Sequence, residues 1–344
     1  MDKQEQKECE DMATIRMKRG IQSDIETMPL LSGEMAVALD TGRVYVGTEE
    51  GTVPMMGDGG DMDTSVYDPQ KKKQDIFAYV DQKRSKRTAR FIIGTASAGW
   101  TQEDCDYLCD GIDDQEEILN AFNALPKEGG EIVLLSGKYS ITEKLGLSLS
   151  TTRKDKPVIL RGNGKSTVLS WEKDVPYAER STMILETAYI SLFDLCLDGN
   201  QKADGIFFGS GFDSDFYRCL TVMNNVYIVN TKVGVRSGGA YYENFAITNC
   251  YFAANEQAMK LFAERCILSN NIFRNNDSAI DFSSRGNYMY CAGNSIYKEG
   301  EYTSSQYTIK LASDSTKCVI VGNVCIGKAP TISGTGNIVD NNVS

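Results

Sequence analysis

The sequence contains no histidine among its 344 residues. Histidine is the commonest general base and metal ligand near neutral pH, so its absence excludes Ser-His-Asp hydrolysis and Cys-His proteolysis. No apolar run approaches the roughly 20 residues that a transmembrane helix requires. The first ten residues, MDKQEQKECE, are polar and acidic, unlike a secretory signal peptide. We therefore expect a protein that is made in the cytoplasm and has no membrane span.

Basic charge is also in deficit, with 36 basic residues against 47 acidic ones and a net charge of −11. Such a charge repels nucleic acid and anionic membranes and argues against both as partners. A hydrophobic content of 41% with 24% charged residues indicates a folded globular chain. The length exceeds one ordinary core and suits several units, or a solenoid with attachments.

The ten cysteines include no paired CxxC motif. Cys105 and Cys109 are four residues apart, and Cys318 and Cys325 are seven apart, spacings that do not match structural zinc sites. In a chain that is not exported, reduced thiols acting as small core hydrophobes are the better interpretation. We predict neither a metal site nor a cofactor from these residues.

Composition divides the chain into four stretches. Residues 1–12 are predicted to be a disordered leader. Residues 13–57 are predicted to form a small β module, because two apolar runs at 35–39 and 44–46 flank an Asp-Thr-Gly turn typical of a β-hairpin. Residues 58–90 are a predicted linker with a short helix, and residues 91–344 a single domain.

The last stretch repeats with a step near 23 residues. A unit of that size cannot bury its own apolar face, so successive coils must stack. Apolar residues alternate with period 2, which sends every second side chain inward. Asparagine at the corners tolerates left-handed backbone and can form amide ladders. The pattern predicts a mainly β fold, a right-handed parallel β-helix. In it Cys266, Met289 and Cys318 share an interior column, and the corner asparagines are Asn225, Asn249, Asn271, Asn294 and Asn323.

A short amphipathic helix is predicted before the first full coil. Ile118, Leu119, Phe122 and Leu125 lie on one helical face. Asp113 or Asp114 is the expected N-cap residue. We expect this helix to cover the open end of the solenoid and its unpaired strand edges.

The stretch CDYLCDGIDDQEEILNAFNALPKEGGEIVLLSGKYSI (105–141) resembles the opening of the pectate-lyase-like β-helix superfamily. That superfamily mixes lyases, hydrolases and binding scaffolds, so the resemblance implies the fold and little about chemistry. No catalytic residue is carried over from it. Lyases in it often use calcium, so calcium is a possible cofactor only if this chain is a lyase.

Residues 15–51, with IRMKRG and GEMAVALDTGRVYVG, are similar to the short modules that begin many bacteriophage tail-fibre, tailspike and baseplate proteins. This resemblance implies a receptor-binding protein of a phage or prophage tail. It also implies a homotrimer in the virion, with tail or baseplate proteins as partners through residues 13–57 and host surface polysaccharide as the ligand.

One outward position of the second predicted strand holds Arg236, Lys260, Asp281 and Lys310 in successive coils, with Arg285 just beyond. Two interpretations stay open. The row could line a polysaccharide groove, with Asp281 as an acid or metal ligand and Arg236 or Lys260 as a base or anion clamp. Alternatively, it is a solvated sheet face with stacked ion pairs.

Paired carboxylates perform glycoside hydrolysis when they lie roughly 5 Å or 6.5–9.5 Å apart. Residues 205–217 are predicted to project as an acidic, aromatic loop, in which Phe212 and Tyr217 contact glycan or a second protomer. Asp198 is expected to shape an Asp-Gly-Asn turn. The carboxylates considered are Asp194, Asp198, Asp204, Asp213 and Asp215.

Two functions remain. The first is a virion protein that binds a cell-surface glycan without turning it over. The second is a polysaccharide depolymerase, either a lyase or a glycoside hydrolase, whose candidate catalytic residues would be Asp281, Asp213, Asp215 and Arg236. The predicted β-helix is short for a depolymerase, which favours binding.

Overall fold

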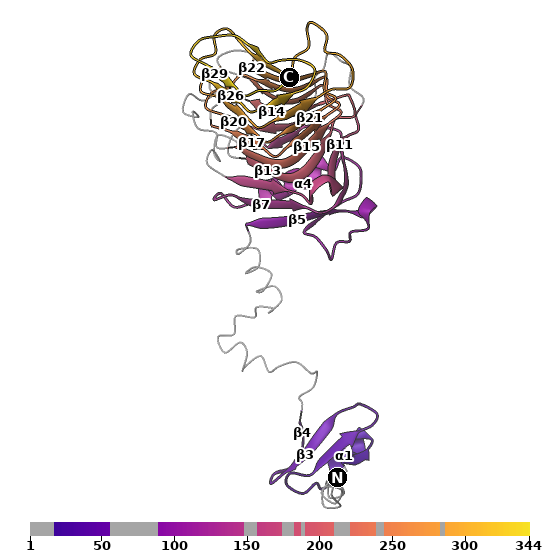
Figure 1. The fold of residues 1–344 in the computed structure, drawn as a ribbon. Helices are drawn as coiled ribbons and strands as arrows, with labels where there is room; N and C mark the ends of the chain where they lie inside the picture. The colour runs from indigo at the N-terminus through magenta and orange to yellow at the C-terminus, as the bar shows by residue number, and fades with distance from the viewer. Residues whose placement is uncertain are drawn as a thin grey trace, which may run out of the picture. The chain divides into compact units, whose positions relative to one another are not determined.

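The computed structural model describes residues 17–55, 89–147, 157–173, 182–186, 190–209, 221–238, 244–282 and 286–344. They belong to two compact units, one within residues 1–87 and one within 88–344 (Figure 1). The predicted leader lies outside the described residues, and so does the predicted linker except for its last two positions. Arg90, the final linker position, already belongs to the first strand of the second unit.

The N-terminal unit is a four-stranded sheet in the order β1-β2-β3-β4, packed against helix α1. β1 pairs with β2 in parallel, whereas β2–β3 and β3–β4 are antiparallel. Its separate small core contains Ile25, Leu30, Ala36, Ala38 and Tyr45. The elements are β1 (Lys18–Gly20), α1 (Gln22–Thr27), β2 (Met35–Ala38), β3 (Val44–Thr48) and β4 (Gly51–Pro54).

The second unit is a parallel β-helix, as the repeat predicted, because all its strand pairs are parallel and each strand pairs with its equivalent one coil away. Figure 1 shows the coils stacked from β5 to β29. One sheet has eight strands: β9 (Leu145–Leu147), β12 (Thr182–Glu186), β14 (Asp204–Gly209), β16 (Val233–Gly238), β19 (Gln257–Leu261), β22 (Ser278–Phe282), β25 (Ile309–Leu311) and β28 (Thr331–Ile332).

The other sheet has 17 strands, in which the long strand β15 of one coil is followed by pairs of short strands in later coils. Its members are β5 (Arg90–Thr95), β6 (Tyr107–Cys109), β7 (Gly130–Leu134), β8 (Gly137–Ile141), β10 (Val158–Arg161), β11 (Thr167–Trp171), β13 (Ile190–Asp198), β15 (Val222–Val229), β17 (Ala246–Thr248), β18 (Tyr251–Ala253), β20 (Ile267–Ser269), β21 (Ile272–Arg274), β23 (Tyr290–Ala292), β24 (Ser295–Tyr297), β26 (Val319–Val321), β27 (Val324–Cys325) and β29 (Ile338–Asp340). Two short 3-10 helices, η1 (Ala96–Ala98) and η2 (Gly164–Ser166), join strands.

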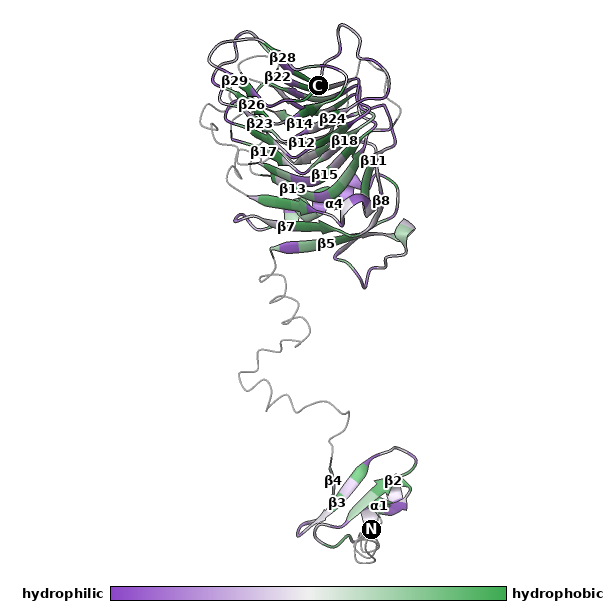
Figure 2. Cartoon of the chain, in the orientation of Figure 1, coloured by the Kyte–Doolittle hydropathy of each residue, from purple (hydrophilic) through white to green (hydrophobic). Residues whose placement is uncertain are grey.

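Alternate residues of each strand fill the interior, which is why the strands are mostly hydrophobic in Figure 2. Phe252 and Phe273 stack in adjacent coils with ring centroids 4.9 Å apart. Cys266, Met289 and Cys318 are all buried and share the interior column that the sequence predicted. Burying one large apolar side chain stabilises the fold by about 1.5–3 kcal/mol. Each coil adds further buried side chains to these columns, so this contribution recurs in every coil.

The corner asparagines correct one detail of the prediction. Asn225 and Asn249 take left-handed backbone, with φ of 54° and 55°. The amide ladder occupies the next residue along, so these two do not belong to the column of Asn271, Asn294 and Asn323. In that ladder each asparagine side chain donates to the side-chain oxygen of its equivalent one coil further, at 2.8–3.0 Å. The prediction merged two adjacent positions because asparagine suits both.

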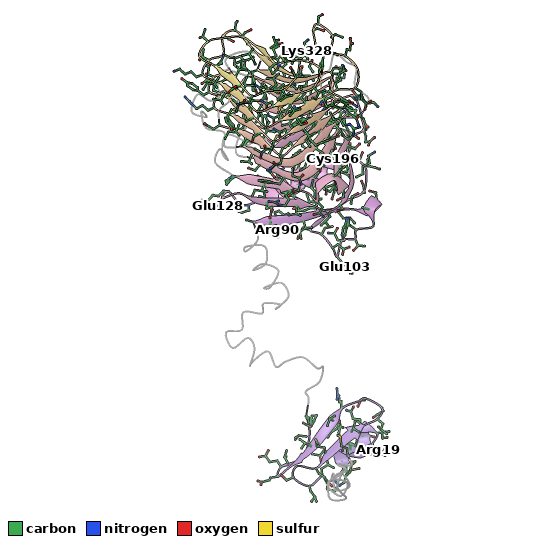
Figure 3. The ribbon with its side chains drawn as sticks, in the orientation of Figure 1. Arg19, Arg90, Glu103, Glu128, Cys196 and Lys328 are labelled. Atoms are coloured by element: carbon green, nitrogen blue, oxygen red, sulfur yellow. The ribbon has the colours of Figure 1, made fainter. Side chains whose placement is uncertain are left out.

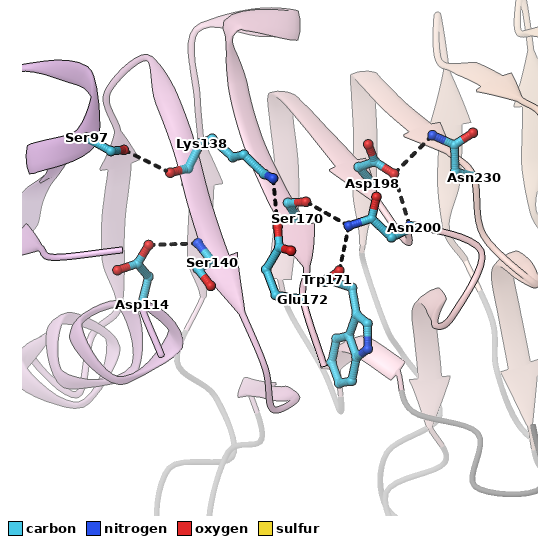
Figure 4. Close-up of polar contacts among 10 residues, drawn as sticks. All are labelled: Ser97, Asp114, Lys138, Ser140, Ser170, Trp171, Glu172, Asp198, Asn200 and Asn230. Carbon is cyan, nitrogen blue, oxygen red and sulfur yellow. Dashed lines mark hydrogen bonds and ion pairs between the residues drawn. The ribbon is translucent and has the colours of Figure 1, made fainter. Parts of the chain in front are cut away.

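Helix α4 (Gln115–Ala124) packs Ile118, Ala121 and Phe122 against the core of the first coils. Asp114 is its N-cap residue, but its carboxylate makes no bond to the helix. It accepts the backbone N–H of Gly111 at 2.8 Å. It also accepts the backbone N–H of Ser140 at 2.7 Å, the contact drawn in Figure 4. Asp114 therefore fastens the helix entry to strand β8 instead of capping the first turn. Among the described residues, no helix is long and apolar enough to cross a membrane.

Candidate functional site

Strand register brings the predicted outward row together on the eight-stranded sheet. Arg236 pairs with Lys260, Lys260 with Asp281, and Asp281 with Lys310. Phe207 of β14 precedes Arg236 in the same row. Neighbouring members therefore lie about 4.8 Å apart along the solenoid axis. The alignment of these residues is a feature of the strand register, whereas their role in glycan binding stays a prediction.

Arg236 is held at one end of the row. Its guanidinium lies over the Phe207 ring, 4.3 Å from the centroid, and its Nε is 2.7 Å from Oδ2 of Asp204. The Asp204 side chain is fully buried, and its other oxygen accepts the Val233 N–H at 3.1 Å. A guanidinium does not lose its proton in proteins. These contacts favour Arg236 as an anchored cation over Arg236 as a base.

Asp281 lies at the centre of the row and is only 4% exposed. The Tyr307 hydroxyl is 3.0 Å from Oδ2 of Asp281 and 2.6 Å from Oε1 of Gln257. The Gln257 amide nitrogen donates to the carbonyl oxygens of Met259 and Ala279, which fixes its orientation. Two acceptors thus face one phenolic proton, so at most one of them is fully satisfied.

The second oxygen of Asp281 has no hydrogen-bond donor among the described residues. Oδ1 is buried and makes no hydrogen bond in the described part of the chain. Lys310 Nζ lies 3.8 Å from Oδ2 and 5.3 Å from the centre of the Tyr307 ring, a loose ion pair with a half-exposed lysine. Burial, and then the charge of Asp281, raise the pKa of the Tyr307 phenol. Buried acceptors this poorly satisfied are rare in native proteins and call for an explanation.

Lys260 completes the row and is exposed. No ion pair or hydrogen bond joins its ammonium group to another residue that the structure describes. Strand pairing fixes the backbone positions of the row before any ligand arrives.

The segment 298–308, between β24 and β25, carries Tyr307 to the row. Lys328, labelled in Figure 3, donates through Nζ to three backbone carbonyl oxygens of this segment. The distances are 2.8 Å to Thr303 and 3.4 Å to Ser304, and Gln306 is the third partner. Lys328 thus fixes the turn that precedes Tyr307.

Tyr307, Gln257 and Lys328 were not predicted from the sequence. The one available signal was the spacing of 29 residues between Asn294 and Asn323, longer than the other repeats. It marks an insertion, but it does not say which inserted side chain returns to the sheet.

Several predicted site residues lie outside the described residues: Phe212, Asp213, Asp215, Tyr217 and Arg285. The predicted loop over 205–217 is wrong in its first part, because strand β14 extends to Gly209. Ile206 and Phe208 point into the core and are fully buried. Period 2 continues through these residues, and the run of aromatic residues concealed it.

The remaining carboxylates do not form a hydrolytic pair among the described residues. Asp194 pairs with Arg161 at 2.6 Å, on the 17-stranded sheet. Asp198 accepts the Asn200 N–H at 3.0 Å and so shapes its turn, as predicted (Figure 4). Asp204 and Asp281 are three coils apart, about 14 Å along the axis, beyond the separations that glycosidases use.

The described residues contain one other cluster of metal-binding types. One ligand atom each of Cys109, Asp114 and Glu117 lies within 4.8 Å of the others. Both Asp114 oxygens already accept backbone N–H groups, and burial raises the pKa values of the Cys109 thiol and the Glu117 carboxyl. Groups that favour their protonated forms are poor cation ligands. Calcium stays a prediction tied to lyase activity.

No known protein family matches the chain, and no curated protein matches it. Solved structures do show similarity. ORF18 of Geobacillus virus E2 is 14% identical with a TM-score of 0.39, over 95% of this chain and 73% of that one. The A-module of the Azotobacter vinelandii mannuronan C-5 epimerase AlgE4 is 18% identical with a TM-score of 0.40, over 62% and 68%. The catalytic domain of a GH87 α-1,3-glucanase, in complex with nigerose, is 11% identical with a TM-score of 0.37, over 67% and 43%. These neighbours comprise one phage protein and two carbohydrate-acting enzymes, and at such scores none carries an argument about this chain's chemistry.

Proposed function

We propose that the chain is a receptor-binding protein of a phage or prophage tail, and that the row on the eight-stranded sheet binds a glycan of the host surface. The observation that carries the binding site is Asp281. Within the described residues Oδ1 has no donor, and Oδ2 shares the Tyr307 proton with Gln257 and lies toward Lys310, so Oδ2 can accept a further hydrogen bond. Sugar hydroxyl groups are donors for such a bond.

The rest of the row suits a carbohydrate ligand. Phe207 and Tyr307 offer aromatic surface, and Lys260 and Lys310 offer charged donors on a rigid scaffold. Orientation by a few well-placed polar groups beside aromatic side chains is typical of ligand sites.

The attachment role rests on the N-terminal unit. Residues 17–55 form a core of their own, separate from the solenoid. Residues 15–51 resemble modules that begin phage tail proteins, which supports docking to a tail or baseplate and, with it, a homotrimer in the virion.

Binding is favoured over hydrolysis because Asp204 and Asp281, the described candidate carboxylates of the eight-stranded sheet, lie three coils apart. A lyase stays the second candidate, since the hydrogen-bonded pair of Tyr307 and Asp281 offers a phenol and a carboxylate at one point of the row.

Glycan binding by the full-length protein can be tested on an array of bacterial capsule, wall and lipopolysaccharide glycans. We expect at least one hit, lost in a Tyr307→Phe variant that keeps its fold. An array without hits would refute the proposal. Release of unsaturated uronate, followed by ultraviolet absorbance, would instead identify a lyase, with rates of about 1 s⁻¹ or more.

A further inference from the structure

The charges of the row point to a class of ligand, and this step rests on the proposed glycan site. We infer that the glycan is an anionic polysaccharide that lies along the solenoid axis, with acid groups recurring roughly every 10 Å, two coil steps.

The first reason is the placement of positive charge. The chain as a whole carries −11, yet Arg236, Lys260 and Lys310 fall in one outward row of adjacent coils. Arg236 is neutralised by buried Asp204, and Lys310 only loosely by Asp281. Lys260 is exposed and unpaired within the described residues, so the row offers two cations to a ligand. Complementary charge of this kind sets specificity and speeds association.

The second reason is the alternation along the row. Asp281 lies between Lys260 and Lys310, so an acid group directly above Asp281 would be repelled and one above either lysine attracted. The two lysines are two coils apart, about 9.6 Å. A glycan with an acid group over each lysine therefore presents a neutral unit, with hydroxyl donors, to Asp281. A polyanion with charge at every unit does not match this pattern.

The acid group can be a uronate carboxylate or a phosphate, because an ammonium group binds either as a point charge. The two sources are separated experimentally.

The test uses the full-length protein and a panel of three glycan groups: uronate-containing, phosphate-containing and neutral polysaccharides. Poly-glutamate serves as a dense polyanion. Binding is measured by biolayer interferometry at about 0.05 and 0.15 M salt, where the Debye length falls from roughly 14 to 8 Å. We expect binding to one anionic group, weakened by salt, and the group bound identifies the acid.

Lys260→Gln and Lys310→Gln should each weaken binding about fivefold to tenfold. Lys165→Gln is the matched control: it removes the same charge from an exposed lysine of η2, away from the row, and should leave affinity unchanged. Circular dichroism confirms that each variant is folded.

Three results would overturn the inference. Hits confined to neutral glycans, lost in the Tyr307→Phe variant, would leave the glycan site standing and exclude the anionic class. Binding of poly-glutamate as tight as that of any glycan would reduce the row to a charge patch. Equal loss in Lys165→Gln and Lys260→Gln would show that overall charge, and not the row, is responsible. An array without hits counts against the glycan site itself.

Discussion

Replacing Asp281 by asparagine separates a binding site from a structural ion pair. In the native protein the single Tyr307 proton faces two acceptors, on Gln257 and Asp281. The Asp281→Asn amide has the same shape and brings donors of its own. It can donate to the Tyr307 oxygen, which leaves the Tyr307 proton for Gln257. Each of these two hydrogen bonds then has its own donor, whereas in the native protein two acceptors share one proton.

The energies have opposite signs. Relieving one buried acceptor without a donor stabilises the fold by about 1–3 kcal/mol. Losing the loose pair with half-exposed Lys310 costs about 0–1 kcal/mol. We therefore expect the free energy of unfolding to rise by about 1 kcal/mol. Glycan affinity should fall at least about tenfold, since hydrogen bonds to a charged acceptor are roughly twice as strong as neutral ones.

Both quantities are measured on the same preparations, stability by guanidinium unfolding followed by circular dichroism, and affinity on the glycan identified by the array. Asp277→Asn is a matched control in the same coil, because Asp277 is an exposed aspartate whose side chain pairs, among the described residues, with Lys298 alone. It should change neither quantity appreciably. A fall in stability of 1 kcal/mol or more with unchanged affinity would show that Asp281 is a structural partner of Lys310, and would refute the reasoning.

Three further predictions concern the scaffold. Asn294→Ala leaves two buried donors and one buried carbonyl oxygen without partners. It should lower the free energy of unfolding, measured with denaturant, by about 3–5 kcal/mol. Cys250→Ala, at the apolar start of the same column, should lower it by about 1 kcal/mol. Lys328→Met should speed hydrogen exchange over 298–308 and weaken glycan binding about threefold to tenfold, with little effect on unfolding; unchanged exchange would contradict its role. Burial raises the pKa values of the Cys196 and Cys325 thiols to about 11 from 9.0. Burying the neutral thiols therefore contributes fully to the free energy of unfolding below pH 9. That contribution is lost as pH rises toward 11, at roughly 1.4 kcal/mol per pH unit for each thiol. The melting midpoint should fall above pH 9, and Cys325→Val should flatten that fall.

The solenoid and its outward row could be predicted because both follow from local periodicity. Period 2 decides which side chains face out, and the repeat length decides which of them share a row. Arg236, Lys260, Asp281 and Lys310 needed no other information. The ladder was less well predicted, because Asn249 and Asn271 occupy adjacent corner positions that favour the same residue type for different reasons, left-handed backbone in one and amide stacking in the other.

The partners of the row could not be predicted in the same way. Tyr307 reaches Asp281 from an inserted segment whose path depends on Lys328 in the following coil. Asp204 meets Arg236 across a coil boundary, although the sequence suggested it only as one of several clustered carboxylates. Period and composition report which face a residue occupies. They do not report which long side chains meet across coils.

The two sheets follow the same folding rules and differ in how they treat their outward charges. On the 17-stranded sheet, Arg161 lies between Glu131 at 3.0 Å and Asp194 at 2.6 Å and stacks on Phe193. Every charge in that network has a partner one coil away, as stability requires of partly buried ions. On the eight-stranded sheet the same spacing was available, yet one oxygen of Asp281 has no donor in the part of the chain that the structure describes. A fold that pairs the charges of this network so closely leaves Asp281 with only a loose ion pair and a shared phenolic proton, which is the strongest reason to assign that carboxylate to a ligand.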